Sequence, residues 1–269
     1  RGDIQDFMVM ARAAGSFAES LSTTAEVYRA AGELMREAGR LQGVADEGGY
    51  WPAFESNEDA LTMLTRAIER AGYTPGQDVG ISLDIAASEF GREGRYRLGL
   101  EGRELDSDGL CELLLGWLDR YAIVSVEDPL AEDDAAGMRR FTAAAGSRVQ
   151  VIGDDFLVTS APRVKDASAS RACNAVLIKP NQAGTVTETR AALLAGKAAG
   201  FGTIVSARSG ETEDTTIVHL AVGWNAGQLK VGSFTRSDRM AKWNEALRIE
   251  EALGGKARFA GRRALPGQR

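Results

Sequence analysis

Short apolar segments alternate along this chain with longer segments whose apolar residues recur at helical spacing. The connections between them are short, and such alternation is typical of βαβ units that build a parallel sheet. Strands that are apolar throughout are expected where both faces of the sheet are covered. The predicted strands span residues 3–10, 79–83, 123–126, 149–152, 175–178, 203–205 and 228–231, and the predicted helices span residues 16–39, 57–71, 107–120, 134–145, 185–199, 212–222 and 236–253, with a short helix from about residue 161.

Two architectures are compatible with this pattern, a doubly wound sheet and a (β/α) barrel. The first predicted strand is not followed by the G-x-G-x-x-G motif of dinucleotide-binding doubly wound folds. A length of 269 residues is usual for one (β/α) barrel. Because a complete barrel of this type has eight strands, we expect an α/β fold of the TIM-barrel type that lacks one strand.

The charge balance argues against polyanionic partners. At a net charge of −6, nucleic acid or an anionic membrane would be repelled. Apolar runs such as residues 122–126 are far shorter than the roughly 20 residues of a membrane helix. Cys111 and Cys173 are expected to be free thiols in a reducing compartment. We therefore predict a cytoplasmic protein with no nucleic-acid partner and no membrane span.

His219 is the sole histidine, and it lies in the apolar stretch TTIVHLAV. Ser-His-Asp, Cys-His and His-rich zinc sites all need imidazole at a defined place. We expect His219 to pack on a helix, so any proton chemistry should use lysine and carboxylate side chains.

The last residues, 254–269, lose the apolar periodicity and accumulate Lys and Arg. We expect residues 1–253 to form the barrel domain and residues 254–269 to form a basic, flexible tail. The alternative is that this tail binds nucleic acid or a protein partner, although terminal charge runs are usually solvated.

Three carboxylates, Asp84, Glu127 and Asp154, follow three consecutive predicted strands. In a barrel the ends of these strands meet at one mouth, where the carboxylates would repel one another. Three hard oxygen ligands suit Mg²⁺, with the remaining positions left to water and substrate. The alternative is that Asp84 or Asp154 caps the helix that follows it.

Two lysines, Lys179 and Lys230, also stand at the ends of predicted strands, and Arg208 and Ser209 follow another strand. A lysine beside a divalent cation and an arginine has its ammonium form disfavoured, which would let it act as a base. The alternative is that each lysine forms a buried ion pair with a carboxylate. Together these cations indicate an anionic substrate that also binds the metal.

Several polar motifs accompany these residues along the chain. They are found at residues 46–49 (DEGG), 84–90 (DIAASEF), 125–128 (SVED), 153–155 (GDD), 177–185 (LIKPNQAGT), 209–215 (SGETEDT) and 247–251 (LRIEE). Over about residues 3–253 the chain closely resembles enolases. The resemblance implies the C-terminal barrel of a Mg²⁺-dependent, homodimeric lyase of glycolysis. The implied reaction is the reversible dehydration of 2-phosphoglycerate, a small phosphorylated carboxylate, to phosphoenolpyruvate.

The resemblance also implies roles for individual residues. Lys179 resembles the general base, Lys230 the partner of the substrate carboxylate, and Glu47 the second acid/base group near the leaving hydroxyl. Arg208 and Ser209 resemble contacts to the phosphate and to a second metal ion.

Further correspondences concern the metal and the first strand. The carboxylates of Asp84, Glu127 and Asp154 resemble the ligands of the structural Mg²⁺. Gln5 and Asp6 stand where enolases carry Gln-Glu, so we assign Gln5 to substrate binding and Asp6 to the catalytic groups.

The chain also departs from the enolase pattern. Asp6 replaces a glutamate, and Ala207 replaces the histidine of a His-Arg-Ser-Gly motif. The first barrel strand, the N-terminal capping domain and a mobile loop of enolases lie outside the matching region, so we expect an incomplete barrel. The alternatives are a diverged enzyme, such as an enolase-like carboxyphosphonoenolpyruvate synthase, and a catalytically impaired enolase-like binding protein.

Overall fold

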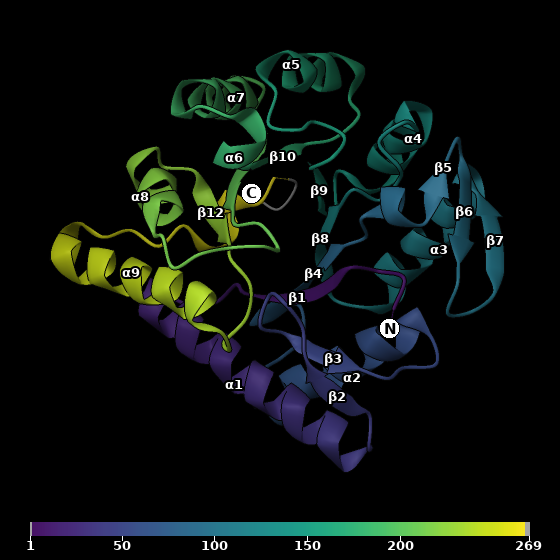
Figure 1. Ribbon diagram of the computed structural model, residues 1–269, viewed down its shortest axis with the longest axis horizontal. Coiled ribbons are helices and arrows are strands. Elements are labelled where there is room, and N and C mark those ends of the chain that lie inside the picture. Colours follow the sequence, from purple (N-terminus) through teal and green to yellow (C-terminus); the bar gives the residue numbers. More distant parts are fainter. Residues whose placement is uncertain (1, 267–269) are drawn as a thin grey trace.

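A curled sheet of seven strands forms the centre of the computed structural model, which describes residues 2–266 (Figure 1). The order across the sheet is β1-β4-β8-β9-β10-β11-β12, so neighbours along the chain are neighbours in space. This is the incomplete barrel of the TIM type that the sequence predicts. The strands are β1 (Asp6–Ala11), β4 (Val79–Asp84), β8 (Ile123–Glu127), β9 (Gln150–Gly153), β10 (Ala175–Ile178), β11 (Gly202–Ser206) and β12 (Gly227–Lys230).

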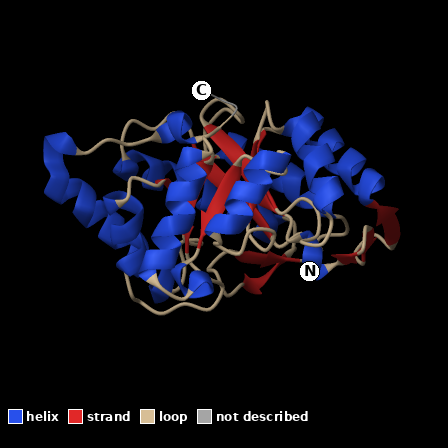
Figure 2. Cartoon of the chain, turned by 90° about the horizontal axis from the view of Figure 1, so that it is seen from above, coloured by secondary structure: helices blue, strands red, loops and turns tan. Residues whose placement is uncertain are grey.

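Helices surround the sheet on its outer face, as Figures 1 and 2 show from two directions. Several begin at a Ser, Thr or Asp whose side chain accepts from a backbone N–H in the first turn, as at Ser16, Asp106 and Thr185. The predicted helix boundaries are therefore close to the observed ones. The helices are α1 (Phe17–Glu37), α2 (Asn57–Arg70), α3 (Ser107–Arg120), α4 (Ala135–Ala145), α5 (Ala161–Ser170), α6 (Pro180–Ala183), α7 (Val186–Ala198), α8 (Thr216–Gly223) and α9 (Ser237–Leu253).

The strand β1 runs antiparallel to β4, with Asp6 opposite Asp84 and Ala11 opposite Val79. The prediction of a wholly parallel sheet is therefore wrong at β1, whereas the strands from β4 to β12 are parallel. The reason is that two helices, α1 and α2, separate β1 from β4. One helix returns the chain to the end where the strand began, and a second helix reverses the direction again.

The two edge strands, β1 and β12, each pair on one side only within the described residues. The predicted open edge is thus confirmed. A cavity of about 1010 Å³ lies along the gap, lined by Met8 and Met10 of β1 and Leu229 of β12. Behind the gap α1 approaches α9, where the backbone N–H of Phe17 donates to Glu250 over 2.6 Å.

Two small sheets were not predicted from the sequence. The hairpin β2 (Leu41–Val44) and β3 (Tyr50–Pro52) lies between α1 and α2, and β5 (Gly91–Arg92), β6 (Arg95–Leu98) and β7 (Arg103–Asp106) lie between β4 and α3. These strands are only two to four residues long, which is too short to produce a clear alternating pattern. The turn of the hairpin carries Glu47, one of the residues that the sequence predicts for the site.

The sequence predicts a flexible tail over residues 254–269. In the structure the end of the described part of this segment, residues 265 and 266, packs against the barrel. Leu265 is buried, and Gln228 of β12 donates through Nε2 to the backbone carbonyl of Ala264 over 3.2 Å. Pro266 lies beside Gly202, at the start of β11. An apolar Leu-Pro pair therefore anchors this segment at the amino-terminal ends of the strands. The remainder of the expected tail, residues 267–269, lies outside the described residues.

His219 is exposed, contrary to the expectation of a packed residue. Its side chain is 56% accessible, and its Nε2 lies 3.0 Å from Oε1 of Glu245 on α9. The buried face of α8 is formed by Val218 and Ala221, which turns His219 outward. Both cysteines are buried free thiols. None of the described helices combines the length and apolarity needed to cross a lipid bilayer.

Candidate active site

The carboxyl ends of the parallel strands bring the predicted site residues together. Asp84, Glu127 and Lys230 are the last residues of β4, β8 and β12, while Asp154 and Lys179 directly follow β9 and β10. Asp84 and Glu127 are register partners in adjacent strands. Because their positions follow from strand pairing, five ionisable side chains converge on one mouth of the barrel.

The ammonium group of Lys230 joins two of the predicted metal ligands. Its Nζ lies 2.7 Å from Asp84 Oδ2 and 3.0 Å from Glu127 Oε2. Burial alone would lower the pKa of Lys230, but the charges of Asp84 and Glu127 outweigh it and hold that pKa well above its ordinary value. Gln5 adds a hydrogen bond to Asp84 Oδ2 of 3.3 Å. Lys230 therefore acts here as a fixed cation.

Lys179 forms an ion pair with Asp154, through Nζ and Oδ2. Both side chains are largely buried, with accessibilities of 13% and 11%. The backbone of Lys179 is held as well, since its N–H donates to Oγ1 of Thr159 over 3.0 Å. The structure thus places the two lysines on different carboxylates of the same cluster.

Two of the predicted metal ligands have a carboxylate oxygen that no hydrogen bond within residues 2–266 satisfies. Glu127 Oε1 and Asp154 Oδ1 are buried and receive no hydrogen bond from any described residue. Burial, followed by the charges of Asp84 and Asp154, raises the pKa of Glu127 well above its ordinary value despite the opposing effect of Lys230. Buried carboxylate oxygens without a donor are costly unless a cation binds them. The residues present therefore fit a hard divalent cation such as Mg²⁺.

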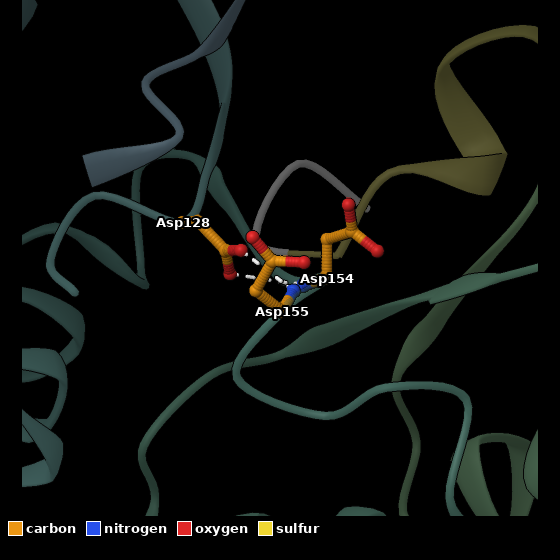
Figure 3. Close-up of side chains that lie close together, drawn as sticks. All are labelled: Asp128, Asp154 and Asp155. Carbon is orange, nitrogen blue, oxygen red and sulfur yellow. Dashed lines mark hydrogen bonds between the residues drawn. The ribbon is translucent and has the colours of Figure 1, made fainter. Parts of the chain in front are cut away.

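A second carboxylate group, not predicted from the sequence, shares Asp154 with the first. One ligand oxygen each from Asp128, Asp154 and Asp155 lies within 4.8 Å of the others, so these residues could hold a metal ion. Asp128 already accepts backbone hydrogen bonds from Asp154 (2.9 Å) and Asp155 (2.7 Å). Figure 3 shows the Asp128 carboxylate facing this backbone while the Asp154 carboxylate points away from it. Asp128 is thus placed to orient the loop that carries Asp154.

Asp6 and Glu47 reach the mouth from the other side of the site. Asp6 starts β1 opposite Asp84, so the antiparallel strand places it at the same end of the barrel as the three carboxylates. Burial, then the charges of Glu47 and Asp84, raise the pKa of Asp6 to about 7, although Lys230 opposes this. Both side chains line the cavity described above, together with Glu127, Ser209 and Lys230.

The β2–β3 turn that carries Glu47 is tied to the segment after β12. The backbone carbonyl of Glu47 accepts from the N–H of Ser233 over 2.8 Å, and that of Gly48 accepts from Thr235 Oγ1 over 2.7 Å. Gly48 has φ +81°, and a Cβ there would lie 2.3 Å from the carbonyl oxygen of Thr235. Glycine is therefore required for this close approach.

The segment after β11 carries Arg208 and the exposed Ser209, which the sequence assigned to substrate binding. Arg208 donates through Nη1 to Asn181 Oδ1 over 3.1 Å. The residue before it, Ala207, is buried and donates its backbone N–H to the carbonyl of Lys230. This segment therefore lies beside both lysine-bearing strand ends.

Two fully buried cations on α9, Arg239 and Lys242, anchor the segment after β11. Arg239 donates to the carbonyls of Arg208 (2.8 Å) and Ser209 (2.7 Å), and also to that of Val231 (2.7 Å). Lys242 pairs with Glu211 at 2.9 Å. Sequence reasoning missed both residues because charged residues in an amphipathic helix normally face solvent. The one feature of the sequence that could have indicated their burial is that both stand next to apolar residues of the helix.

Comparison with known proteins finds relatives over nearly the whole chain. The family model of the enolase C-terminal TIM barrel domain matches residues 1–267. Enolase 1 of Desulfitobacterium hafniense (strain Y51) is 50% identical over 260 residues, which are 96% of this chain and 60% of that protein. The chain therefore spans about 60% of the length of this curated relative.

Proposed function

Because this chain belongs to the enolase family, whose C-terminal barrel domain it carries, we propose that it provides the catalytic barrel of an enolase-type Mg²⁺-dependent lyase. The single observation that carries this proposal is the convergence of two lysines and three carboxylates at one end of the barrel. A binding scaffold would have no need for buried carboxylates with free oxygens beside buried lysines.

The proposed reaction is the reversible dehydration of 2-phosphoglycerate to phosphoenolpyruvate, as in glycolysis. The proton next to the substrate carboxylate is weakly acidic, so its removal needs a positioned base and nearby positive charge. Lys179 is the proposed base. Its ammonium group, which is paired here with Asp154, must first release a proton to solvent, so that the neutral Nζ can accept the proton from the substrate. Lys230 keeps its own proton and is proposed to pair with the substrate carboxylate.

The proposed ligands of Mg²⁺ are Asp84, Glu127 and Asp154. When bound, the ion would supply Lewis-acid charge that stabilises negative charge developing on the substrate carboxylate. Glu127 Oε1 and Asp154 Oδ1 support this assignment, because they are buried acceptors without a donor among the described residues.

The remaining residues are assigned to the leaving group and the phosphate. Glu47 and Asp6 lie on the cavity wall and are proposed to handle the proton of the leaving hydroxyl. Gln5 is proposed to contact substrate from its position beside Asp84. Arg208 and Ser209 are proposed to contact the phosphate and a second metal ion, on a segment held by Arg239.

Two substitutions favour a second candidate, a diverged enolase-like enzyme that acts on a different substrate, such as a carboxyphosphonoenolpyruvate synthase. Asp6 is one methylene shorter than the glutamate of the enolase pattern, and Ala207 offers no side-chain hydrogen bond. If the reaction is that of ordinary enolases, restoring Asp6→Glu and Ala207→His together should raise activity on 2-phosphoglycerate. No gain would favour the second candidate.

We further propose that the protein acts in the cytoplasm as a homodimer and has no nucleic-acid partner. The net charge of −6 supports the absence of a polyanionic partner. The two buried free thiols support a reducing compartment.

The decisive experiment follows exchange of the α-proton of 2-phosphoglycerate with solvent deuterium by NMR, with and without Mg²⁺. We expect Mg²⁺-dependent exchange that Lys179→Ala abolishes. Lys165→Ala, on exposed α5, is the matched control and should exchange at the parent rate. Exchange by Lys179→Ala at the parent rate would refute the assignment of the base.

A further inference from the structure

The loop between Asp154 and α5 contains two consecutive left-handed residues that are not glycine. Val158 has φ +44° and Thr159 has φ +52°. The left-handed region is sterically unfavourable for β-branched residues, because their branched Cβ crowds the backbone. Strained backbone of this kind persists only where the surroundings enforce it, and it concentrates at functional sites.

The strained loop delivers the Thr159 hydroxyl to the start of the next loop. The Thr159 side chain is buried, and its Oγ1 accepts from the backbone N–H of Lys179 over 3.0 Å. The same oxygen lies 3.0 Å from Gln182 Oε1 and 3.3 Å from the carbonyl of Leu177, so its single proton has an acceptor. Thr159 therefore links the loop after β9 to the loop after β10.

These contacts close a ring around the proposed base. Asp154 begins the strained loop and pairs through its side chain with Lys179, while Thr159 ends the loop and binds the backbone of the same lysine. The turn in between is held by the N–H of Val158, which donates to the carbonyl of Asp154 over 2.7 Å. Pro180 restricts the backbone of Lys179 from the other side, and Lys179 is extended, as a residue before proline should be.

We propose that Thr159 is a positioning residue for Lys179. Its hydroxyl fixes the lysine backbone so that Nζ pairs with Asp154 as the ammonium and, once it has lost a proton to solvent, lies in reach of the proton that it removes. This inference rests on the proposed function of Lys179 as the base, and it adds a residue to which that function assigns no role. Glycine would adopt this left-handed backbone without strain, but it has no hydroxyl group. The strain at Thr159 is therefore the cost of placing a hydroxyl beside the Lys179 N–H.

A matched threonine elsewhere in the barrel separates positioning from ordinary stabilisation. Thr203 of β11 is also buried, and its Oγ1 donates to the backbone carbonyl of Ala226 over 2.7 Å. It lies near the amino-terminal end of its strand, whereas Thr159 lies at the catalytic end. Thr159→Val and Thr203→Val therefore remove comparable buried hydroxyls at opposite ends of the barrel.

The first measurement does not depend on the reaction. Lysines of the metal-free protein are acylated with a limiting amount of acetic anhydride, and mass spectrometry compares Lys179 with the exposed Lys165 as internal reference. We expect Lys179 to be labelled faster in Thr159→Val than in the parent. Labelling in Thr159→Ser, which keeps the hydroxyl, and in Thr203→Val should match the parent.

The second measurement is exchange of the α-proton of 2-phosphoglycerate with solvent deuterium. Thr159→Val should reduce the rate at saturating substrate by about 10- to 100-fold, as expected for a small displacement of a catalytic group, with KM nearly unchanged. Thr159→Ser should restore most of the rate, and Thr203→Val should keep it. If Thr159→Val does not fold, Thr159→Ala, which adds no methyl group beside the Lys179 N–H, is used in its place.

The outcomes distinguish this inference from the proposed function. Unchanged Lys179 labelling together with a parent-like exchange rate in the hydroxyl-free variant would overturn the positioning role. A loss of rate equal in Thr159→Val and Thr203→Val would also overturn it, because general destabilisation would then explain both. If the parent itself shows no exchange, the proposed function fails, and the labelling comparison alone decides whether Thr159 positions Lys179.

Discussion

Replacing Arg239 with methionine should destabilise the protein strongly, although Arg239 itself is not proposed to contact the substrate. The Arg239 side chain is fully buried, and its guanidinium donates to three backbone carbonyls, those of Arg208, Ser209 and Val231. Methionine fills much of the same volume but donates nothing. The change therefore tests what the hydrogen bonds contribute.

The expected loss follows from these contacts. A hydrogen bond from a charged donor contributes about 1.5–3 kcal/mol. Removing one partner of a buried ionic network costs about 3–5 kcal/mol. We take this second figure for Arg239→Met because part of the loss can be recovered when water reaches the carbonyls. For a chain of this size each kcal/mol corresponds to roughly 2–4 °C in Tm, so the midpoint should fall by about 6–20 °C.

The assay is urea and thermal unfolding of the parent, Arg239→Met and the control Arg236→Met. Arg236 precedes the same helix, but its side chain is 48% exposed and lies 3.7 Å from Asp238, so its loss should cost less than about 1 kcal/mol. Arg239→Met should also weaken binding of inorganic phosphate, because the segment with Arg208 and Ser209 loses its anchor. A Tm within about 2 °C of the parent would refute the reasoning.

Three further changes have clear expected outcomes. Asp154→Ala should abolish Mg²⁺ binding measured by calorimetry, along with the gain in Tm that Mg²⁺ gives the parent; unchanged binding would show that Asp154 is not a ligand. Gly48→Ala should lower Tm and the catalytic rate, because alanine at φ +81° would meet a backbone carbonyl; a parent-like protein would contradict the close approach. The third change concerns Asp134. Burial tends to raise the pKa of its carboxyl group, but hydrogen bonds from groups that include Ser107 and Tyr96 outweigh burial and lower that pKa below its ordinary value of 3.8. Its ionisation therefore stabilises the fold fully above that value, and the benefit is lost as pH falls through the lower folded pKa, so Asp134→Asn should flatten the acid limb of a stability-against-pH curve.

The strands and their order were predictable because burial on both faces produces apolar runs that stand out from the helical pattern. The direction of β1 was missed although both helices between β1 and β4 were predicted. The alternation of strands and helices was interpreted as successive βαβ units, and an apolar run has the same period in either direction. The hairpin with Glu47 was missed for a different reason, because its strands are half exposed and held by contacts to the segment after β12.

The candidate site was predictable where residues stand at the carboxyl ends of strands, as Asp84, Glu127 and Lys230 do. Residues that act through backbone contacts gave no such signal. Asp128 binds two amides of a loop that is distant in sequence, and Arg239 binds carbonyls from two segments. Such roles depend on which loops meet in space, and no local pattern of residue types records that.

The reversed direction of β1 has a consequence for engineering this barrel. In an all-parallel barrel the loops after the strands reshape the substrate pocket, and libraries are designed to vary those loops. Here the first residue of β1, Asp6, and the residue before it, Gln5, face the pocket, whereas the residues after Ala11 face the opposite end. A library restricted to the segments after strands would leave this wall of the pocket unchanged, and selection for a bulkier substrate should begin upstream of β1.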